Sequence, residues 1–532
     1  MNIAIVLAGG TGKGSGVLIP NQYNLIAGRP VIDYVLDAVN ASGKTDKTVI
    51  VMDRQWFNYS AMIREEDYDI VQSGETRMES LYNALKHIKA NYACDKVVIL
   101  DANAPFIYGD LIDEYFSRLD EYDTVITAQK ITGGFTDIHD SRLDREQYII
   151  TQSPEGFRFE LLWKNYDLHF PYQEIAGMLP DGSKRYYNFQ FRNNVKLTHD
   201  FELTFAELML QNLGKLNSSK NVAFFDKDIL LTEGLKMNLL RTRPEETMKW
   251  VDMVYANMPR LIAKWGVTSF LPNQISRYGL VLQAVSRIHG EVILKFIPDF
   301  VNRYERELEA MKILPKSYMC GLMDVDEQSK CMLMEKITPA RYACFEENLK
   351  LTEMFRHVIA DAVPYSEDLH LQYIPLYFDE LKQKLEDAST MPYCRELVEP
   401  ELRYAVALFE QEFADAPLYV MHGDLHELNI LDNGKRFYGI DPGGMLGPLE
   451  LECVRFIRND VRNHPAFGYD ARFDILLRSF GRFVDIRKLV CMFIIDMAYC
   501  TFNSTFENED PAETYVDLEL IRIAKEWRKN NA

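Results

Sequence analysis

The stretch His422-Gly423-Asp424-Leu425-His426-Glu427-Leu428-Asn429-Ile430-Leu431 is the most specific pattern in the chain. It follows an apolar run at residues 418–421 and precedes a second run at 437–440, and both runs predict strands. The second predicted strand ends directly before Asp441. The sequence therefore concentrates polar side chains in a tight loop between two strands and at the end of the second one.

Three side chains of this region suit phosphoryl transfer from ATP, and the loop lets them converge. A carboxylate must orient the attacking hydroxyl and accept its proton, and the catalytic candidate for this role is Asp424. Mg²⁺ needs oxygen ligands beside the phosphates, and Asn429 and Asp441 can supply them. The spacing H-x-D-x-x-x-x-N followed by a strand-borne Asp thus predicts a kinase site that uses ATP and Mg²⁺.

Upstream residues complete the predicted ATP site. Lys295 ends an apolar strand-like run and can reach the α- and β-phosphates of ATP. Glu307, in the next helical pattern, is the expected ion-pair partner of Lys295, and Glu305 and Glu309 are the alternatives. We expect Met334 to begin the hinge segment that hydrogen-bonds adenine.

Residues from about 265 to 500 resemble the aminoglycoside phosphotransferase and choline kinase superfamily, which has a protein-kinase-like fold. The resemblance rests on the loop quoted above and on Ile440-Asp441-Pro442, with Gly447-Pro448 following. It implies an α+β domain that phosphorylates a small-molecule hydroxyl, because no protein-kinase activation segment is visible. One departure is that residues 274–279 contain no G-x-G-x-x-G phosphate loop.

The first 130 residues alternate between apolar runs and amphipathic stretches. The apolar runs predict strands at 3–7, 48–52, 96–100 and 124–128. The helical patterns between them lie at 30–41, 77–89 and 110–119. Apolar strands separated by helices predict a parallel sheet that is covered on both faces, and such a sheet binds ligands at the carboxyl ends of its strands.

A glycine-rich loop, Gly9-Gly10-Thr11-Gly12-Lys13-Gly14-Ser15-Gly16, follows the first predicted strand. Glycines let backbone amides approach a phosphate chain closely. The loop matches neither the Walker A pattern nor the dinucleotide fingerprint, so by itself it indicates a phosphate cradle and a flexible turn about equally.

Further motifs follow this loop in an order that resembles the cytidylyltransferases acting on methylerythritol phosphate or ribitol 5-phosphate. They lie at residues 20–23, 28–32, 74–80, 101–106, 152–157 and 194–198. The resemblance covers about residues 1–215 and implies a Rossmann-type α/β nucleotidyltransferase domain with a mostly parallel sheet. In the implied reaction, a sugar or polyol phosphate attacks the α-phosphorus of CTP, releases pyrophosphate and forms a CDP-alcohol.

The resemblance also implies which residues bind CTP. Asp101 is expected beside the ribose and Mg²⁺, and the residues expected around the nucleotide and its phosphates are Ala8, Gly9, Gly10, Gly12, Lys13, Arg77, Ser80 and Lys196. Three positions lack the cation that the family usually has, namely Gly14, Asn21 and Ala104. Removing one donor that stabilises a transition state typically costs about 10²–10³-fold in rate, so the activity of this domain stays open at this point.

Composition limits the remaining possibilities. The net charge of −20 argues against a nucleic-acid partner, which usually requires a basic patch. The 8 cysteines form no C-x-x-C pair, as expected for thiols of a reducing compartment. The N-terminus lacks the basic region of a signal peptide, and no apolar stretch reaches the ~20 residues of a membrane span. We therefore expect a cytoplasmic protein without membrane insertion, and a homo-oligomer is compatible with the sequence.

The two resemblances predict three segments: a cytidylyltransferase-like domain over residues 1–218, a helical connector over 219–262 and a kinase-like domain over 263–532. The polar stretch 217–221 is the linker signal. Together they predict a bifunctional enzyme that phosphorylates a small alcohol (a polyol, sugar or amino alcohol) and activates the phosphate with CTP for cell-surface polymer synthesis. The alternative is a small-molecule kinase whose degenerate N-terminal domain serves binding or scaffolding.

Overall fold

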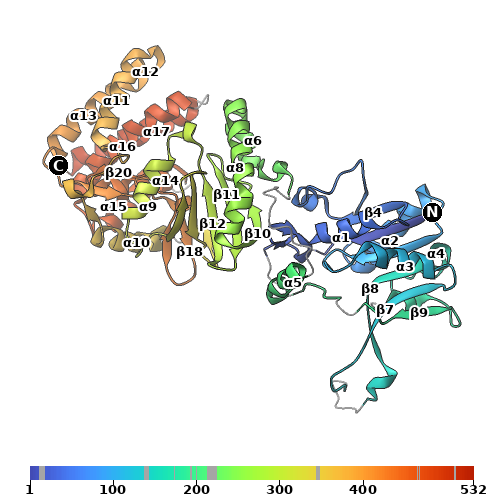
Figure 1. The fold of residues 1–532 in the computed structure, drawn as a ribbon. Coiled ribbons are helices and arrows are strands. Elements are labelled where there is room, and N and C mark those ends of the chain that lie inside the picture. Colours follow the sequence, from blue (N-terminus) through green and yellow to red (C-terminus); the bar gives the residue numbers. More distant parts are fainter. Residues whose placement is uncertain are drawn as a thin grey trace. The chain divides into compact units, whose positions relative to one another are not determined.

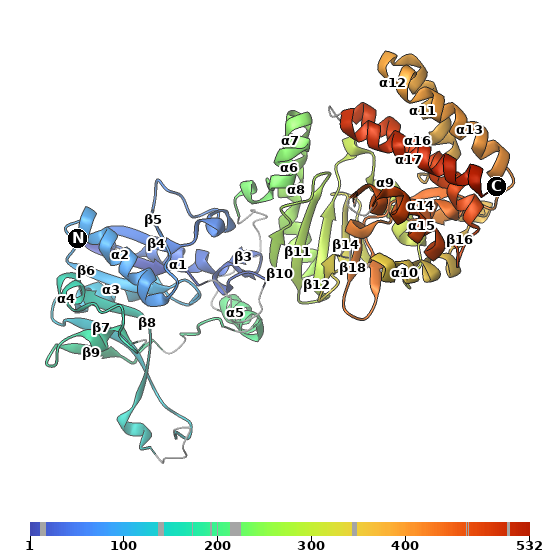
Figure 2. The same ribbon diagram turned by 180° about the vertical axis from the view of Figure 1, so that it is seen from behind.

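A computed structural model describes residues 1–10, 18–136, 143–172, 174–191, 194–198, 200–212, 225–342, 348–463, 465, 468–507 and 511–531. The chain divides into two compact units, Met1–Val292 and Ile293–Ala532, which are described separately (Figures 1 and 2). The predicted linker at 217–221 lies outside the described residues. Within the described ranges, no helix combines the length and the apolar character that a bilayer crossing requires.

A mixed sheet with the strand order β5-β4-β1-β6-β8-β7-β9 is the centre of the N-terminal unit. Its strands are β1 (Asn2–Leu7), β4 (Lys47–Met52), β5 (Asp69–Gln72), β6 (Lys96–Asp101), β7 (Thr124–Lys130), β8 (Ile149–Arg158) and β9 (Arg185–Asn188). β5, β4, β1 and β6 pair in parallel, whereas β8 runs antiparallel to both β6 and β7. The predicted strands are confirmed, and so is the mostly parallel sheet that the resemblance implies.

Helices cover both faces of this sheet, as the apolar strands predict. Successive side chains of a strand point to opposite faces. Ala4 and Val6 of β1 accordingly join the core beneath α1 (Val31–Ala41) and α3 (Gly109–Arg118). Ile3 and Ile5 join the core beneath α2 (Arg77–Asn91) and α4 (Phe159–Asn165). The two-sided burial leaves the strand ends as the place where polar side chains can gather.

The segment predicted as a helical connector contains α6 (Glu233–Met237), α7 (Leu239–Thr242) and most of α8 (Pro244–Trp265), which continues past residue 262. Gly266, with a φ of 62°, ends α8 in the left-handed conformation that glycine tolerates best. A second sheet follows in the order β10-β11-β12-β14-β13. Its strands are β10 (Val267–Pro272), β11 (Leu280–Ser286), β12 (Gly290–Phe296), β13 (Leu322–Asp326) and β14 (Cys331–Glu335). The boundary between the two units falls within β12.

The C-terminal unit is α+β, with small antiparallel sheets and a large set of helices (Figure 2). One sheet has the order β15 (Arg341–Tyr342), β18 (Ile430–Asp432) and β19 (Phe437–Gly439), and the other β16 (Val363–Pro364), β17 (Tyr419–Met421) and β20 (Met445–Gly447). The helices are α9 (Tyr304–Ile313), α10 (Asn348–Ala360), α11 (Tyr377–Thr390), α12 (Pro392–Leu397), α13 (Glu399–Phe413), α14 (Glu450–Asn463), α15 (Tyr469–Phe480), α16 (Ile486–Glu507) and α17 (Pro511–Asn530).

Helix α16 lies at the centre of these helices and contacts α11, α13, α14 and α17. A helix that is apolar on all sides is buried on all sides, and residues 489–498 of α16 are all buried. Asp496 is the charged residue in this stretch, and Arg455 and Arg458 of α14 lie 2.9 Å from its carboxylate. The apolar run that fell short of a membrane span is therefore the core of the C-terminal unit.

We predict that Phe157→Ala destabilises the N-terminal unit by about 3–5 kcal/mol, because the Phe157 ring is fully buried against α2 and α4 and the change leaves a cavity. Denaturant unfolding followed by circular dichroism measures the loss. Tyr148→Ala, at a ring that is 44% exposed, is the control and should change the free energy of unfolding by no more than about 0.5 kcal/mol. Equal effects of the two changes would contradict this account of the core.

Candidate functional site

Asp101 ends strand β6, and its buried carboxylate lies between two cations. Lys196 Nζ is 2.8 Å from Oδ2, and Arg77 Nη2 is 3.4 Å from Oδ1. Burial opposes the ionisation of Asp101, but the charges of Arg77 and Lys196 more than offset it, so the pKa of Asp101 lies below its usual value. The three residues come from different segments: Asp101 from the end of β6, Arg77 from the beginning of α2 and Lys196 from the chain beyond β9. They meet at the carboxyl edge of the sheet, as the fold class predicts.

Two cavities adjoin this bridge and share Arg77, Asp101 and Lys196 in their walls. The first has a volume of about 260 Å³, and its other walls include Gly9, Gly10, Gln22, Gly74 and Ser80. The second has a volume of about 230 Å³, and its other walls include Ala104, Ser153, Glu155, Glu174 and Asn194. Six of the residues predicted to bind CTP therefore line one cavity: Gly9, Gly10, Arg77, Ser80, Asp101 and Lys196.

The first cavity is formed where the glycine loop approaches the beginning of α2. A Cβ atom on Gly9 would lie 2.5 Å from the Ser73 Cβ, so only glycine fits this close approach. Ser80 Oγ accepts a hydrogen bond of 3.0 Å from the Gly74 N–H, and Thr76 caps α2 together with Glu79. The N–H groups of Gly74, Glu75, Thr76 and Glu79 already donate to side chains of this segment, so the wall is held in a fixed shape beside the glycines of the loop.

The remaining residues that the sequence analysis singled out in this domain do not all lie at the first cavity. Ala8 is buried beneath the loop, and its carbonyl accepts a hydrogen bond of 2.7 Å from Gln22 Nε2. Gly12, Lys13 and Gly14 lie outside the described residues. Asn21 donates to the Thr198 carbonyl at 3.3 Å, and Ala104 is buried in the wall of the second cavity. Among the described residues, the cationic side chains that line the two cavities are Arg77 and Lys196.

In the C-terminal unit, Lys295 lies buried between two carboxylates. Its Nζ forms an ion pair with Glu307 and lies 3.0 Å from Asp441 Oδ1. Burial disfavours the charged amine, but Asp441 and Glu307 more than offset this, so the pKa of Lys295 lies above its usual value. This ion pair confirms the predicted partner, Glu307. The two alternatives have other partners, since Glu305 pairs with Lys330 and Glu309 accepts backbone N–H groups of residues 372–374.

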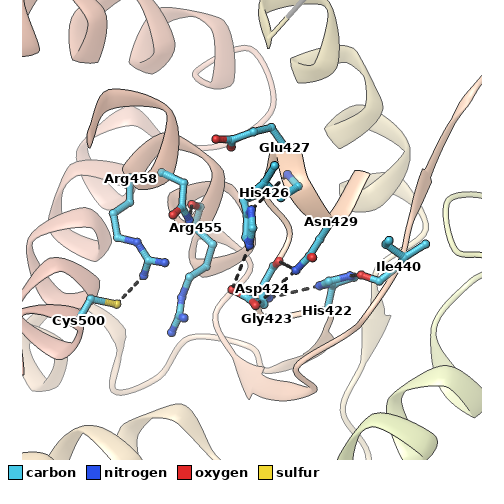
Figure 3. Close-up of polar contacts among 12 residues, drawn as sticks. His422, Gly423, Asp424, His426, Glu427, Asn429, Ile440, Arg455, Arg458 and Cys500 are labelled. Carbon is cyan, nitrogen blue, oxygen red and sulfur yellow. Dashed lines mark hydrogen bonds and ion pairs between the residues drawn. The ribbon is translucent and has the colours of Figure 1, made fainter. Parts of the chain in front are cut away.

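Hydrogen bonds within the loop 422–431 orient Asp424 (Figure 3). The buried His422 ring lies 2.8 Å from the Ile440 carbonyl through Nε2, and its Nδ1 accepts the Asp424 N–H at 3.3 Å. Burial lowers the pKa of His422 to about 4, so the ring stays neutral and can donate at one nitrogen while it accepts at the other. Asn429 Nδ2 donates to the Asp424 carbonyl at 2.8 Å and lies 3.4 Å from its carboxylate.

These contacts join the two halves of the predicted kinase site. The Ile440 N–H donates to the Asn429 carbonyl at 2.9 Å, so Asp441 follows directly on the strand that holds the loop. Asn429 Oδ1 and the second oxygen of Asp441 accept no hydrogen bond from the part of the chain that the structure describes. Oxygen atoms of this kind are the ligands that Mg²⁺ prefers, and two protein ligands suffice where phosphates supply others.

Around Asp101, fewer carboxylate oxygen atoms are suited to bind Mg²⁺ than around Asp441. Asp101 is ionised, but the neighbouring Glu155 is not favoured as an anion, because burial raises its pKa to about 7. One ionised carboxylate suits an ion that nucleotide phosphates hold for the most part. Within the described ranges, no three His, Cys, Asp or Glu side chains are grouped so that they could hold a metal ion by themselves.

Sequence reasoning missed buried acidic groups around the loop. Glu427 is buried, and its Oε1 accepts a hydrogen bond of 3.1 Å from Asn463. Glu452 of α14 accepts the Gly423 N–H at 3.2 Å, and burial raises the pKa of this carboxyl to about 7. Met334 lies buried on β14. A lone acid within an apolar helix pattern, as at Asp496, is a signal of a buried charge, whereas Glu452 lies among other charged residues of α14 and gives no such signal.

Comparisons with known proteins bear on the N-terminal part. Residues 2–212 match the family model of IspD, 2-C-methyl-D-erythritol 4-phosphate cytidylyltransferase. The enzyme of this name from Thermotoga neapolitana is 33% identical over 167 residues, which are 30% of this chain and 75% of the relative. The chain belongs to this family. It is therefore a nucleotidyltransferase of the cytidylyltransferase type, and enzymes of the family use CTP with Mg²⁺.

Two further matches extend the comparison. The bifunctional ribulose 5-phosphate reductase/CDP-ribitol pyrophosphorylase Bcs1 of Haemophilus influenzae is 24% identical over 254 residues, 42% of this chain and 51% of that enzyme. A crystal structure of 4-diphosphocytidyl-2C-methyl-D-erythritol synthase from Anaerococcus prevotii covers 40% of this chain and 96% of its own, at 22% identity and a TM-score of 0.35.

We predict that Gly423→Ala destabilises the C-terminal unit by about 2 kcal/mol or more. Gly423 has a φ of 73°, and an added Cβ would lie 2.8 Å from the Met445 Cβ. Gly434→Ala is the matched control, because Gly434 has a φ of 81° and no atom within 4 Å of an added Cβ, so only about 1 kcal/mol of backbone strain is expected. Urea unfolding compares the two variants, and equal losses would contradict the close packing of the loop.

Proposed function

We propose that the chain is a bifunctional enzyme. Its C-terminal part phosphorylates a small alcohol with ATP, and its N-terminal part joins the phosphorylated alcohol to CMP from CTP to form a CDP-alcohol for cell-surface polymers. The two reactions follow each other, since the product of the first is the acceptor of the second. The segments proposed for these roles are residues 1–218 and 263–532, connected by 219–262.

The arrangement around Lys295 is the observation on which the kinase proposal rests. A buried ammonium group between Glu307 and Asp441 is held in place for the α- and β-phosphates of ATP. Asp424, oriented by Asn429, accepts the proton of the acceptor hydroxyl as its oxygen attacks the γ-phosphorus. Met334 would lie beside the adenine, in keeping with a resemblance to the aminoglycoside phosphotransferase and choline kinase superfamily. Mg²⁺ bound by Asn429 and Asp441 would neutralise charge on the phosphates.

Family membership supports the second reaction, and the first cavity suggests how it would proceed. The CTP phosphates would lie against Gly9, Gly10 and Ser80 at the beginning of α2. An oxygen of the acceptor phosphate attacks the α-phosphorus of CTP, and pyrophosphate leaves. Arg77 and Lys196 offset the negative charge that grows during the attack, while Asp101 keeps both cations in position.

The relatives support a polyol phosphate as acceptor and a fusion with a second enzyme. The Haemophilus influenzae relative is named for a reductase of ribulose 5-phosphate and a CDP-ribitol pyrophosphorylase in one chain. By its name, one half of that enzyme supplies the acceptor of the other half. A kinase in the present chain would do the same by a different reaction.

The alternative is a small-molecule kinase whose N-terminal part only binds a ligand or a partner. Asn21 and Ala104 favour this alternative, because neither position supplies a cation to the cavities. Nucleotidyl transfer depends on such cations, so the two possibilities differ in whether pyrophosphate is released from CTP.

We predict that Asp424→Asn lowers phosphoryl transfer by at least about 10²-fold, because the variant keeps the shape of the side chain but cannot accept the hydroxyl proton. ADP formation is followed with ATP, Mg²⁺ and a panel of polyols, sugars and amino alcohols. ATP binding, measured by calorimetry, should stay within about twofold of the wild type. Asp415→Asn, the same change at an exposed residue, is the control, and unchanged turnover in the Asp424 variant would refute the kinase assignment.

We predict that Asn21→Lys raises pyrophosphate release from CTP by about tenfold or more, since it adds a cation near the cavity that holds the nucleotide. The assay uses CTP, Mg²⁺ and either ribitol 5-phosphate or 2-C-methyl-D-erythritol 4-phosphate. Asn91→Lys adds the same charge at the exposed end of α2 and should leave the rate unchanged. No release by either the wild type or the variant with any acceptor phosphate would favour the binding or scaffolding alternative.

A further inference from the structure

The two ring nitrogens of His426 have different surroundings in the loop 422–431. His426 precedes a short 3₁₀ helix (Glu427–Asn429), and its Nδ1 accepts the Leu428 N–H at 3.3 Å. A ring nitrogen that accepts a hydrogen bond carries no proton, so the proton of the ring lies on Nε2. Nδ1 therefore caps the short helix, while Nε2 presents an N–H group.

This N–H group faces the carboxylate of Asp424 (Figure 3). Nε2 of His426 lies 3.9 Å from Oδ1 of Asp424, which is too long for a hydrogen bond, since the usual N···O distance is about 2.7–3.2 Å. The described part of the chain offers Nε2 no closer acceptor. The gap is narrow enough for an oxygen atom of a bound molecule to contact the N–H group and the carboxylate at the same time.

The backbone places His426 and Asp424 on the same side of the loop. His426 is extended, with a φ of −134° and a ψ of 174°, and side chains alternate along extended backbone. The intervening Leu425 is fully buried in the apolar core, and Glu427 is buried beside Asn463. The side chains of Asp424 and His426 are 34% and 18% exposed, so a substrate can reach both of them.

His422, the other histidine of the loop, has no such free group. Its ring is fully buried, and its two nitrogens contact the Ile440 carbonyl and the Asp424 N–H. Both nitrogens of His422 thus serve to hold the loop. His426 uses one nitrogen for the loop and leaves the other for a ligand.

The position of Nε2 limits what this N–H group can contact during phosphoryl transfer. The attacking hydroxyl gives its proton to Asp424, and its oxygen must keep a lone pair for the γ-phosphorus. A donor on that oxygen would weaken the attack. The outer oxygen atoms of the γ-phosphoryl group carry negative charge as the group approaches the hydroxyl beside Asp424, so they are the better acceptors for Nε2–H.

We propose that His426 is a further catalytic residue of the kinase site, whose Nε2–H donates to an oxygen of the phosphoryl group during its transfer. The bond between the γ-phosphorus and the oxygen that bridges it to the β-phosphorus breaks, and a bond to the acceptor oxygen forms. The hydroxyl proton goes to Asp424, and His426 keeps its proton throughout. This assignment rests on the proposed kinase function and adds one residue to that site.

Two substitutions separate the roles of the two nitrogens. His426→Asn keeps an oxygen near the place of Nδ1, which can accept the Leu428 N–H, but has no donor at the place of Nε2. His426→Gln is longer, and its amide N–H reaches the place of Nε2. We expect kcat for ADP formation to fall about 10²-fold in the Asn variant and to return to within about tenfold of the wild type in the Gln variant. The KM for ATP should change less than about threefold in both.

The assay uses the full-length chain with ATP, Mg²⁺ and ribitol, and then the other polyols, sugars and amino alcohols of the panel. His357→Asn, at an exposed residue of α10, is the control and should turn over like the wild type. Denaturant unfolding checks that each variant is folded.

Binding of two ATP analogues distinguishes a catalytic role from a structural one. ADP with aluminium fluoride and Mg²⁺ imitates the phosphoryl group during transfer, whereas β,γ-imido-ATP imitates the bound substrate. By calorimetry, His426→Asn should weaken binding of the first about 10²-fold and of the second less than about twofold, because the hydrogen bond forms only as the phosphoryl group moves.

The assignment is wrong if His426→Asn turns over like the wild type, since capping by Nδ1 would then be the whole role of the ring. It is equally wrong if His426→Gln is as slow as His426→Asn, or if His426→Asn weakens both analogues by the same factor. Failure of the kinase function itself has a different signature: the wild type forms no ADP with any alcohol of the panel and does not bind β,γ-imido-ATP, which leaves His426 no phosphoryl group to contact.

Discussion

A buried charge must have a partner of opposite charge, and the bridge around Asp101 meets this requirement at the edge of the N-terminal sheet. The carboxylate at the end of β6 is ionised only because Arg77 and Lys196 face it. These cations come from α2 and from the chain beyond β9, so the folded sheet is needed to bring them together. The bridge also adjoins two cavities with different walls, one of which includes three glycines and the other Glu155, Glu174 and Asn194.

The same requirement shapes the C-terminal unit, with the signs reversed. Here a buried ammonium group, Lys295, is stabilised by Glu307 and Asp441. Helix α9 supplies the first carboxylate, and the second follows the end of β19. The contact between Lys295 and Asp441 joins residues that are 146 positions apart in the sequence. The neutral ring of His422 links the same strand to the loop that contains Asp424. Electrostatic pairing thus joins Lys295 to Glu307 and Asp441, and hydrogen bonds join Asp424 to Asn429.

The sequence predicted a large part of the fold because buried strands and helices have characteristic patterns of apolar residues. Strands β1, β4, β6 and β7 are apolar on both faces, and helices α1, α2 and α3 lie between them as expected. The sequence did not predict strand β8, because Pro154 and Gly156 argue against a strand, although the sheet accommodates both. The burial of Glu427 could not be predicted, because a charged residue in a loop is usually exposed. Helix α14, from which Asn463 donates to it, was not visible from the loop sequence.

The sequence by itself determined the order of the elements and the loop that contains Asp424, and it limited the partner of Lys295 to three glutamates of one helix. These features depend on short-range periodicity and on spacing within single motifs. Only the tertiary structure decided that Arg77, Asp101 and Lys196 form one bridge, and that Glu155 and Asn194 face a cavity beside it. The physical reason is that hydrogen-bond satisfaction and desolvation depend on what surrounds each atom, and the surroundings of these atoms come from strands and loops far apart in the chain.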